Sequence, residues 1–94
     1  MKGSTVDWKV GLMKDLKDPE FSKGYVQACI EEGAPLEVAL RDVVRAQGVA
    51  KVARRARMDR TDVIRALRPM TKLRLNTVRG LLRGVGLKLA VCPI

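Results

Sequence analysis

The chain has little of what most enzymes and metal proteins need. Its 94 residues contain no histidine, which is the usual general base and the commonest metal ligand. Its two cysteines, Cys29 and Cys92, are too few for a disulfide framework or a zinc site, and we interpret them as reduced thiols. No Ser, Cys or Lys lies in a recognisable nucleophile motif. We therefore expect no enzymatic activity, no metal and no cofactor.

Long apolar runs and aromatic residues are also scarce. No run approaches the roughly 20 residues of a membrane span, and the N-terminus lacks an apolar signal segment. We therefore expect a cytoplasmic protein without a membrane partner. One Trp, one Tyr and one Phe leave the core to aliphatic side chains, which favours helices over a β-sandwich. The composition predicts one small all-α domain.

Positive charge is concentrated in the second half of the chain. Residues 1–47 carry seven Lys or Arg and eight Asp or Glu, a net charge of −1. Residues 48–94 carry twelve Lys or Arg and two Asp or Glu, a net charge of +10. A basic half joined to a near-neutral half favours a surface that binds a polyanion, with nucleic acid as the leading candidate.

Two amphipathic helices are predicted before the basic half. Asp18 and Pro19 are typical of a helix start, and Gly33 of its end. A second helix is expected from about residue 35 to Gly48. Their predicted buried positions are Phe21, Tyr25, Val26, Cys29 and Ile30, then Leu36, Ala39, Leu40, Val43 and Val44.

Residues 49–68 have the pattern of a helix-turn-helix. The apolar positions fit two short helices, one over 49–56 and one beginning near residue 60, where Asp59 is expected to cap with Asp62 in a weak capping box. Glycine is common at the turn position that Arg57 occupies here, and a left-handed residue other than glycine costs about 1 kcal/mol, so we expect a differently shaped turn. The predicted buried residues are Val52, Ala53, Ala56, Met58, Val63, Ala66 and Leu67.

The outward faces of both helices are polar and basic. The first helix turns out Lys51, Arg54 and Arg55, where a helix crossing a DNA backbone meets phosphates. The second turns out Arg60, Thr61, Ile64, Arg65 and Arg68. The alternative is an ordinary helix pair with solvated arginines.

A last helix is predicted after a loop over residues 69–75. Asn76 is expected to cap it, and Gly86 to end it after about Val85. Arg74, Asn76 and Thr77 at its start suit a DNA phosphate, or else form an ordinary cap. Its predicted buried residues are Val78, Leu81, Leu82 and Val85.

Both ends of the chain alternate apolar and polar residues. The arm over residues 1–17 starts with a flexible "MKGST", and its Trp8 either anchors a partner or folds back on the domain over residues 18–94. Near the other end, Leu87, Leu89 and Val91 predict a short strand. Its edge would pair with residues 6–10 or with a second copy of the chain.

Five segments carry a family resemblance over about residues 14–91: "LKDPEF", "LRDVVRAQG", "VAKVARRARM", "RTDVIRAL" and "RLNTVRGLLRGVGLKLAV". Together they resemble the addiction-module antidote family, the HigA-type antitoxins with a Cro/lambda-repressor-like helix-turn-helix bundle of about five helices. The resemblance implies a homodimer that binds double-stranded operator DNA of its own operon and neutralises a toxin resembling the RelE/HigB ribonucleases. It also places four residues on the recognition helix, where they would contact bases: Arg60, Thr61, Ile64 and Arg65. "PMTKL" replaces a longer loop of the family, so no DNA contact is carried over to it.

The leading hypothesis is therefore an antitoxin that also represses its own operon. A stand-alone phage-type repressor without a toxin is the alternative within DNA binding. A basic RNA-associated or partner-docking module with nonspecific charge is the alternative outside it.

Overall fold

The computed structural model describes residue 11 and residues 14–94, and the described part is all-helical, as predicted. None of its helices is long and apolar enough to cross a membrane. The predicted N-terminal arm, including Trp8, lies mostly outside the described residues. The helices are α2 (Pro19–Glu31), α3 (Leu36–Gln47), α4 (Val49–Ala56), α5 (Arg60–Ala66) and α6 (Leu75–Gly84).

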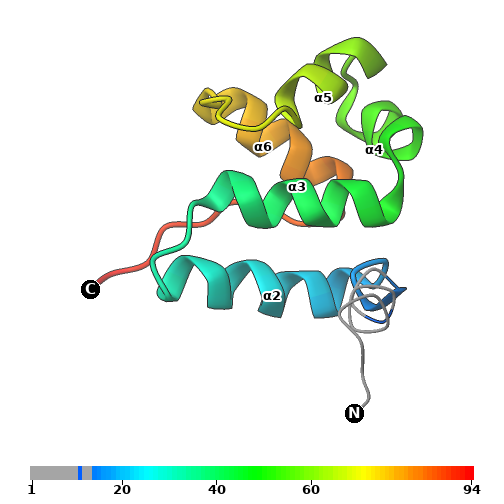
Figure 1. Cartoon of the computed structure of the whole chain (residues 1–94). Helices are drawn as coiled ribbons and strands as arrows, with labels where there is room; N and C mark the ends of the chain where they lie inside the picture. The colour runs from blue at the N-terminus through cyan, green and yellow to red at the C-terminus, as the bar shows by residue number, and fades with distance from the viewer. Residues whose placement is uncertain (1–10, 12–13) are drawn as a thin grey trace.

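Helix α3 lies at the centre, with α2 on one side and α4–α6 on the other (Figure 1). Gln47 at its end donates a hydrogen bond to the carbonyl oxygen of Val85 at 3.0 Å. The helices share one aliphatic core. The buried positions predicted for α3, the helix-turn-helix and α6 are confirmed as core or as partly buried contacts of it: Leu36, Ala39, Leu40, Val43, Val44, Val52, Ala53, Ala56, Met58, Val63, Ala66, Leu67, Val78, Leu81, Leu82 and Val85.

Helix α2 begins as predicted and buries a narrower face than predicted. The predictions for Val26, which is buried, and for Tyr25 and Cys29, which are partly buried against the core, are confirmed. The Asp18 carboxylate accepts a hydrogen bond from the backbone N–H of Glu20 at 3.0 Å, with Pro19 in the first turn. The predicted burial of Phe21 and Ile30 is wrong, because they are 42% and 50% exposed. Ser22 is buried instead, and its hydroxyl donates to the Leu16 carbonyl at 2.7 Å. A small polar residue is buried there because this bond satisfies its hydroxyl.

A side-chain hydrogen bond joins α2 to α3. The Tyr25 hydroxyl donates to the Asp42 carboxylate at 2.7 Å. Burial and the bond to the carboxylate raise the pKa of Tyr25 above its usual range. The pair therefore holds the α2–α3 hairpin together while the phenol is neutral.

Helices α4 and α6 approach each other closely at Gly84. A Cβ at this position would lie 2.7 Å from the carbonyl oxygen of Val52 and 2.8 Å from its side chain. Only glycine permits this approach, since real side chains essentially never make such contacts. The helix-turn-helix is thereby anchored on α6.

The predicted C-terminal strand is wrong for the single chain. Residues 87–94 form neither helix nor strand. The Leu87 N–H instead donates to the Leu82 carbonyl at 2.7 Å, after Gly86 turns the chain with φ of +93°. Alternation alone does not make a strand, because a strand needs a neighbour, and the described residues supply none.

Candidate nucleic-acid interface

The turn between α4 and α5 contains a residue in the left-handed backbone conformation, which we expected to be absent because this position is not glycine. Arg57 follows α4 with φ of 57° and ψ of 42°. The next N–H, that of Met58, donates to the Ala53 carbonyl at 3.0 Å and closes the end of α4. The expectation of a differently shaped turn is therefore wrong. Arg57 adopts the left-handed conformation that glycine commonly has at this position, and this costs free energy.

Helix α5 starts where predicted, but its expected side-chain cap is absent. Asp59 is the N-cap residue and has an extended backbone, but its carboxylate makes no capping hydrogen bond. Asp62 forms a surface ion pair with Arg65, with Oδ1 and Nη1 3.4 Å apart. Exposed pairs of this kind contribute little stability, so Arg65 can exchange its partner at low cost.

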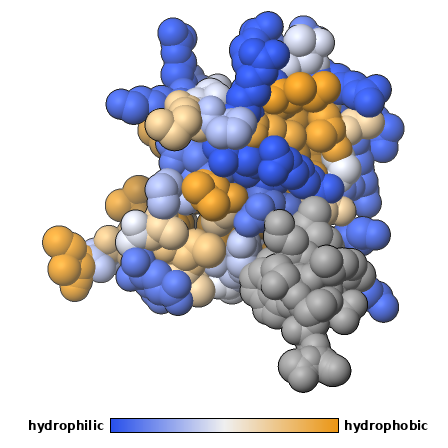
Figure 2. Space-filling model, in the orientation of Figure 1, coloured by the Kyte–Doolittle hydropathy of each residue, from blue (hydrophilic) through white to orange (hydrophobic). Residues whose placement is uncertain are grey.

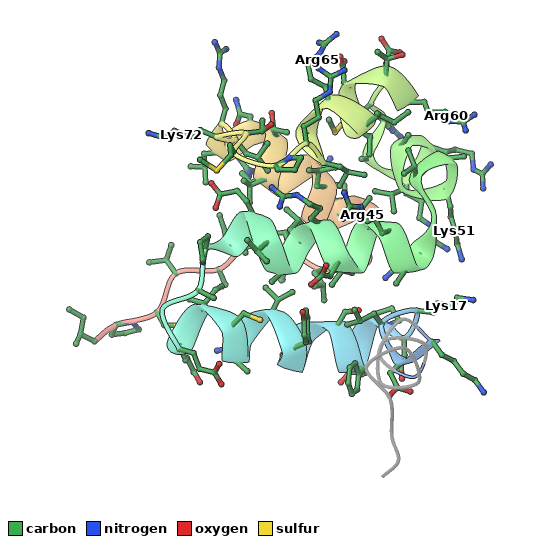
Figure 3. The ribbon with its side chains drawn as sticks, viewed as in Figure 1. Lys17, Arg45, Lys51, Arg60, Arg65 and Lys72 are labelled. Atoms are coloured by element: carbon green, nitrogen blue, oxygen red, sulfur yellow. The ribbon has the colours of Figure 1, made fainter. Side chains whose placement is uncertain are left out.

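The outer face of α5 brings the predicted base-reading residues together. Val63 and Ala66 hold the inner face in the core. The outer residues are exposed, and Ile64 leaves 46% of its surface open although it is apolar. Arg60 and Arg65 project away from the body of the molecule (Figure 3). The four residues on this face are Arg60, Thr61, Ile64 and Arg65.

The cations predicted to contact phosphates lie on the surface of α4 and just beyond α5. Lys51, Arg54 and Arg55 on α4 are exposed, as is Arg68 just beyond α5. Val52 and Ala53, between them in sequence, are buried, so α4 turns one side to the core and the other to solvent. All three predicted phosphate contacts of α4 therefore lie on its solvent side.

The start of α6 differs from the prediction by two residues. The N-cap is Arg74 and not Asn76, which lies in the first turn. No side chain caps the helix. The Arg74 backbone is extended, with ψ of 152°, and turns the chain into the helix without a capping side chain. Arg74 and Asn76 are exposed and Thr77 is half-buried, so polar side chains stand beside the amide end of α6.

Sequence reasoning missed two arginines that support the end of α5. Arg41 donates from Nη2 to the carbonyl of Arg68 at 3.2 Å, and Arg45 donates to that of Leu67 at 3.4 Å. Both come from α3, and cations at a helix C-terminus complement its dipole. A possible signal was their spacing, i and i+4, on the α3 side that borders its buried face.

Lys72 was also missed. It is exposed in the loop between α5 and α6, and Figure 3 shows it pointing outward on the same side of the molecule as Arg65. Projecting hydrophilic side chains stand on the side that carries α5, around a hydrophobic patch (Figure 2). Exposed cations therefore come from α4, from α5 and from the loop after α5, whose outer helix face also offers Thr61 and Ile64.

Comparison with known proteins gives one family match. The family model described as "Probable addiction module antidote protein" matches residues 8–93. No curated protein and no solved structure matches the chain.

Proposed function

Because this chain belongs to the probable addiction module antidote family, we propose that it is an antitoxin that also binds the operator of its own operon. The observation that carries DNA binding is the outer face of α5, which is held rigidly by the core and by Arg41 and Arg45. Supported along its inner face by the core and at its C-terminal end by these two arginines, this helix can enter a DNA major groove without losing core contacts.

Sequence would be read by four residues of that face. Arg60 and Arg65 carry guanidinium groups suited to bidentate contacts with guanine, each worth about 1–3 kcal/mol of discrimination. Thr61 offers a hydroxyl, and the exposed Ile64 suits the methyl group of thymine. On binding DNA, the Arg65 guanidinium would leave the Asp62 carboxylate and contact the base instead.

The phosphates would be contacted from three elements. Cations of α4 and the end of α5 lie beside the reading face, and the amide end of α6 adds a favourable dipole. Such contacts fix the protein on the duplex without specifying sequence. They come from Lys51, Arg54, Arg55, Arg68, Arg74, Asn76 and Thr77.

The proposed partner set is a second copy of the chain, a double-stranded operator and a toxin resembling the RelE/HigB ribonucleases. A two-fold dimer would place its recognition helices about 34 Å apart, one turn of DNA, which predicts a palindromic site. We place this non-enzymatic protein in the cytoplasm, where the operon and the toxin's target would be. Co-purification with a toxin encoded beside its gene would support the antitoxin role over a stand-alone repressor.

Alanine substitutions test the two kinds of DNA contact separately. Arg65→Ala should cost about 1–3 kcal/mol on the operator and little on random duplex. Lys51→Ala should weaken both duplexes alike and lower the salt dependence by about one counterion. Lys14→Ala, which removes an exposed charge ahead of α2, is the matched control and should change neither. Equal losses on both duplexes for Arg65→Ala and Lys51→Ala would refute the assignment.

A further inference from the structure

A hollow on the protein surface lies where the turn between α4 and α5 meets α6. It has a volume of about 390 Å³, and its lining comes from the end of α4, the turn and α6: Ala56, Met58, Asn76, Thr77, Arg79, Gly80 and Arg83. Gly80 contributes no side chain to it, and a Cβ at this position would lie 3.4 Å from the sulfur atom of Met58. Since a water molecule takes about 30 Å³, the hollow has room for a tetrahedral oxyanion and several waters.

The charge that lines this hollow has one sign. Arg79 and Arg83 are exposed and stand four residues apart, so they share one side of α6. None of the lining residues carries a carboxylate. Among residue 11 and residues 14–94, the structure has a single ion pair, which joins Arg65 to Asp62 and leaves both α6 arginines unneutralised. Like charges at this spacing repel each other, and an anion held between them would remove that repulsion.

The remaining polar groups of the hollow complement an oxyanion. Asn76 offers an amide NH₂ and Thr77 a hydroxyl, and both lie on the first turn of α6, ahead of Arg79. Guanidinium groups bind phosphate through two parallel hydrogen bonds, and neutral donors satisfy the remaining oxygens. The hollow therefore combines two cations with two neutral donors, which is the chemistry of a phosphate site.

The position of the hollow favours a phosphate of duplex DNA over a free ion. Met58, on its other wall, lies two residues before Arg60, the first residue of α5, which projects away from the body of the molecule (Figure 3). A helix that enters the major groove has a phosphate backbone on either side of it. The hollow thus adjoins the end of α5 that would enter the groove.

We infer that this hollow binds one backbone phosphate of the DNA, with Arg79 and Arg83 as its shared cationic ligands. The inference rests on the proposed function and deepens it, because it adds two contact residues that helical patterning around α5 did not indicate. A backbone phosphate is the same in every sequence, so the site would strengthen binding without selecting the operator.

Fluorescence anisotropy with the upstream duplex and a shuffled duplex, over a range of salt concentrations, tests the site. Arg79→Gln and Arg83→Gln should each weaken binding to both duplexes by the same factor, up to about eightfold at 0.1 M salt, the value of one released counterion. Both variants should fold, since both side chains are exposed. Lys23→Gln removes an exposed cation from α2 and is the matched control, which should change neither affinity.

The double variant distinguishes one shared phosphate from two. If Arg79 and Arg83 hold the same phosphate, the double variant lowers the slope of log affinity against log salt by about 0.9 in total. A fall of about twice that size would overturn the shared site. Affinities that stay unchanged, or that fall no more than in Lys23→Gln, would overturn the phosphate site altogether.

Nuclear magnetic resonance identifies the source of the phosphate. The backbone amides of Thr77 and Gly80 should shift on adding the shuffled duplex to the wild-type chain and stay in place in the double variant. Saturable shifts with inorganic phosphate and none with DNA would overturn the inference. Operator preference that persists beside an unchanged salt slope would refute only the hollow, whereas a lowered slope without any operator preference would refute only the proposed function.

Discussion

Gly84→Ala should destabilise the protein by opening the contact between α4 and α6. The added Cβ would lie 2.7 Å from the Val52 carbonyl oxygen, 2.8 Å from the Val52 side chain and 3.1 Å from Ala56 Cβ. Neither the backbone oxygen nor the buried valine can move without shifting a helix. Overpacking of this kind costs about 1–3 kcal/mol. Since Gly84 is the last residue of α6, little helix propensity is regained.

Gly80→Ala is the matched control for this prediction. It lies in the same helix, and its added Cβ would meet only Met58 Sδ at 3.4 Å, the flexible end of a side chain. Replacing a glycine inside a helix gains up to about 1 kcal/mol. Urea unfolding followed by circular dichroism should therefore show changes of opposite sign for the two variants. Equal changes, or a gain for Gly84→Ala, would refute the close packing of α4 on α6.

Two further changes test the turn and the hairpin. Arg57→Gly should stabilise the protein by about 0.5–1 kcal/mol in urea unfolding, because it relieves a left-handed arginine, and a loss would contradict that conformation. Tyr25→Phe should cost about 1 kcal/mol near neutral pH by removing the bond to Asp42. Because the folded-state pKa of Tyr25 is raised, its contribution is complete below about pH 10, the unfolded value, and is lost at higher pH. The stability difference between wild type and Tyr25→Phe should accordingly shrink above pH 10, and a constant difference would contradict the raised pKa.

Much of the fold could be predicted from the sequence because each helix carries its own periodic apolar face. Val52, Val63 and Leu81 could be assigned to the core from spacing alone, and the bounds 49–56 of α4 are as predicted. Asp18 also caps α2 as expected, since that bond depends only on neighbouring residues. The family assignment is confirmed by the match over residues 8–93.

The predictions that failed depend on surroundings that local spacing does not reveal. Asn76 and Asp59 are good caps by residue type, yet neither side chain makes a capping bond. Arg57 adopts a strained conformation because α4 and α5 are each held in the core on either side of it. Phe21 stays exposed since α2 has one main helical neighbour, α3, and buries only a narrow stripe.

The supporting contacts of the candidate site could not be predicted for the same reason. Arg41 and Arg45 act on α5 from a helix more than twenty residues earlier, through hydrogen bonds to backbone carbonyls. Carbonyl acceptors have no sequence signature. The outward residues of α5, in contrast, follow from helical periodicity, and the exposure predicted for Arg60, Thr61, Ile64 and Arg65 is what the structure has.

The measurement that tests the central claim most directly is binding of the purified chain to the duplex upstream of its own gene and to a shuffled duplex of equal length, each at two salt concentrations. If α5 reads bases, preference for the upstream duplex persists at the higher salt, while affinity for the shuffled duplex falls away. If the affinities for the two duplexes are equal and decline together as salt rises, residues 48–94, with their net charge of +10, form only an electrostatic surface. That result would contradict operator recognition.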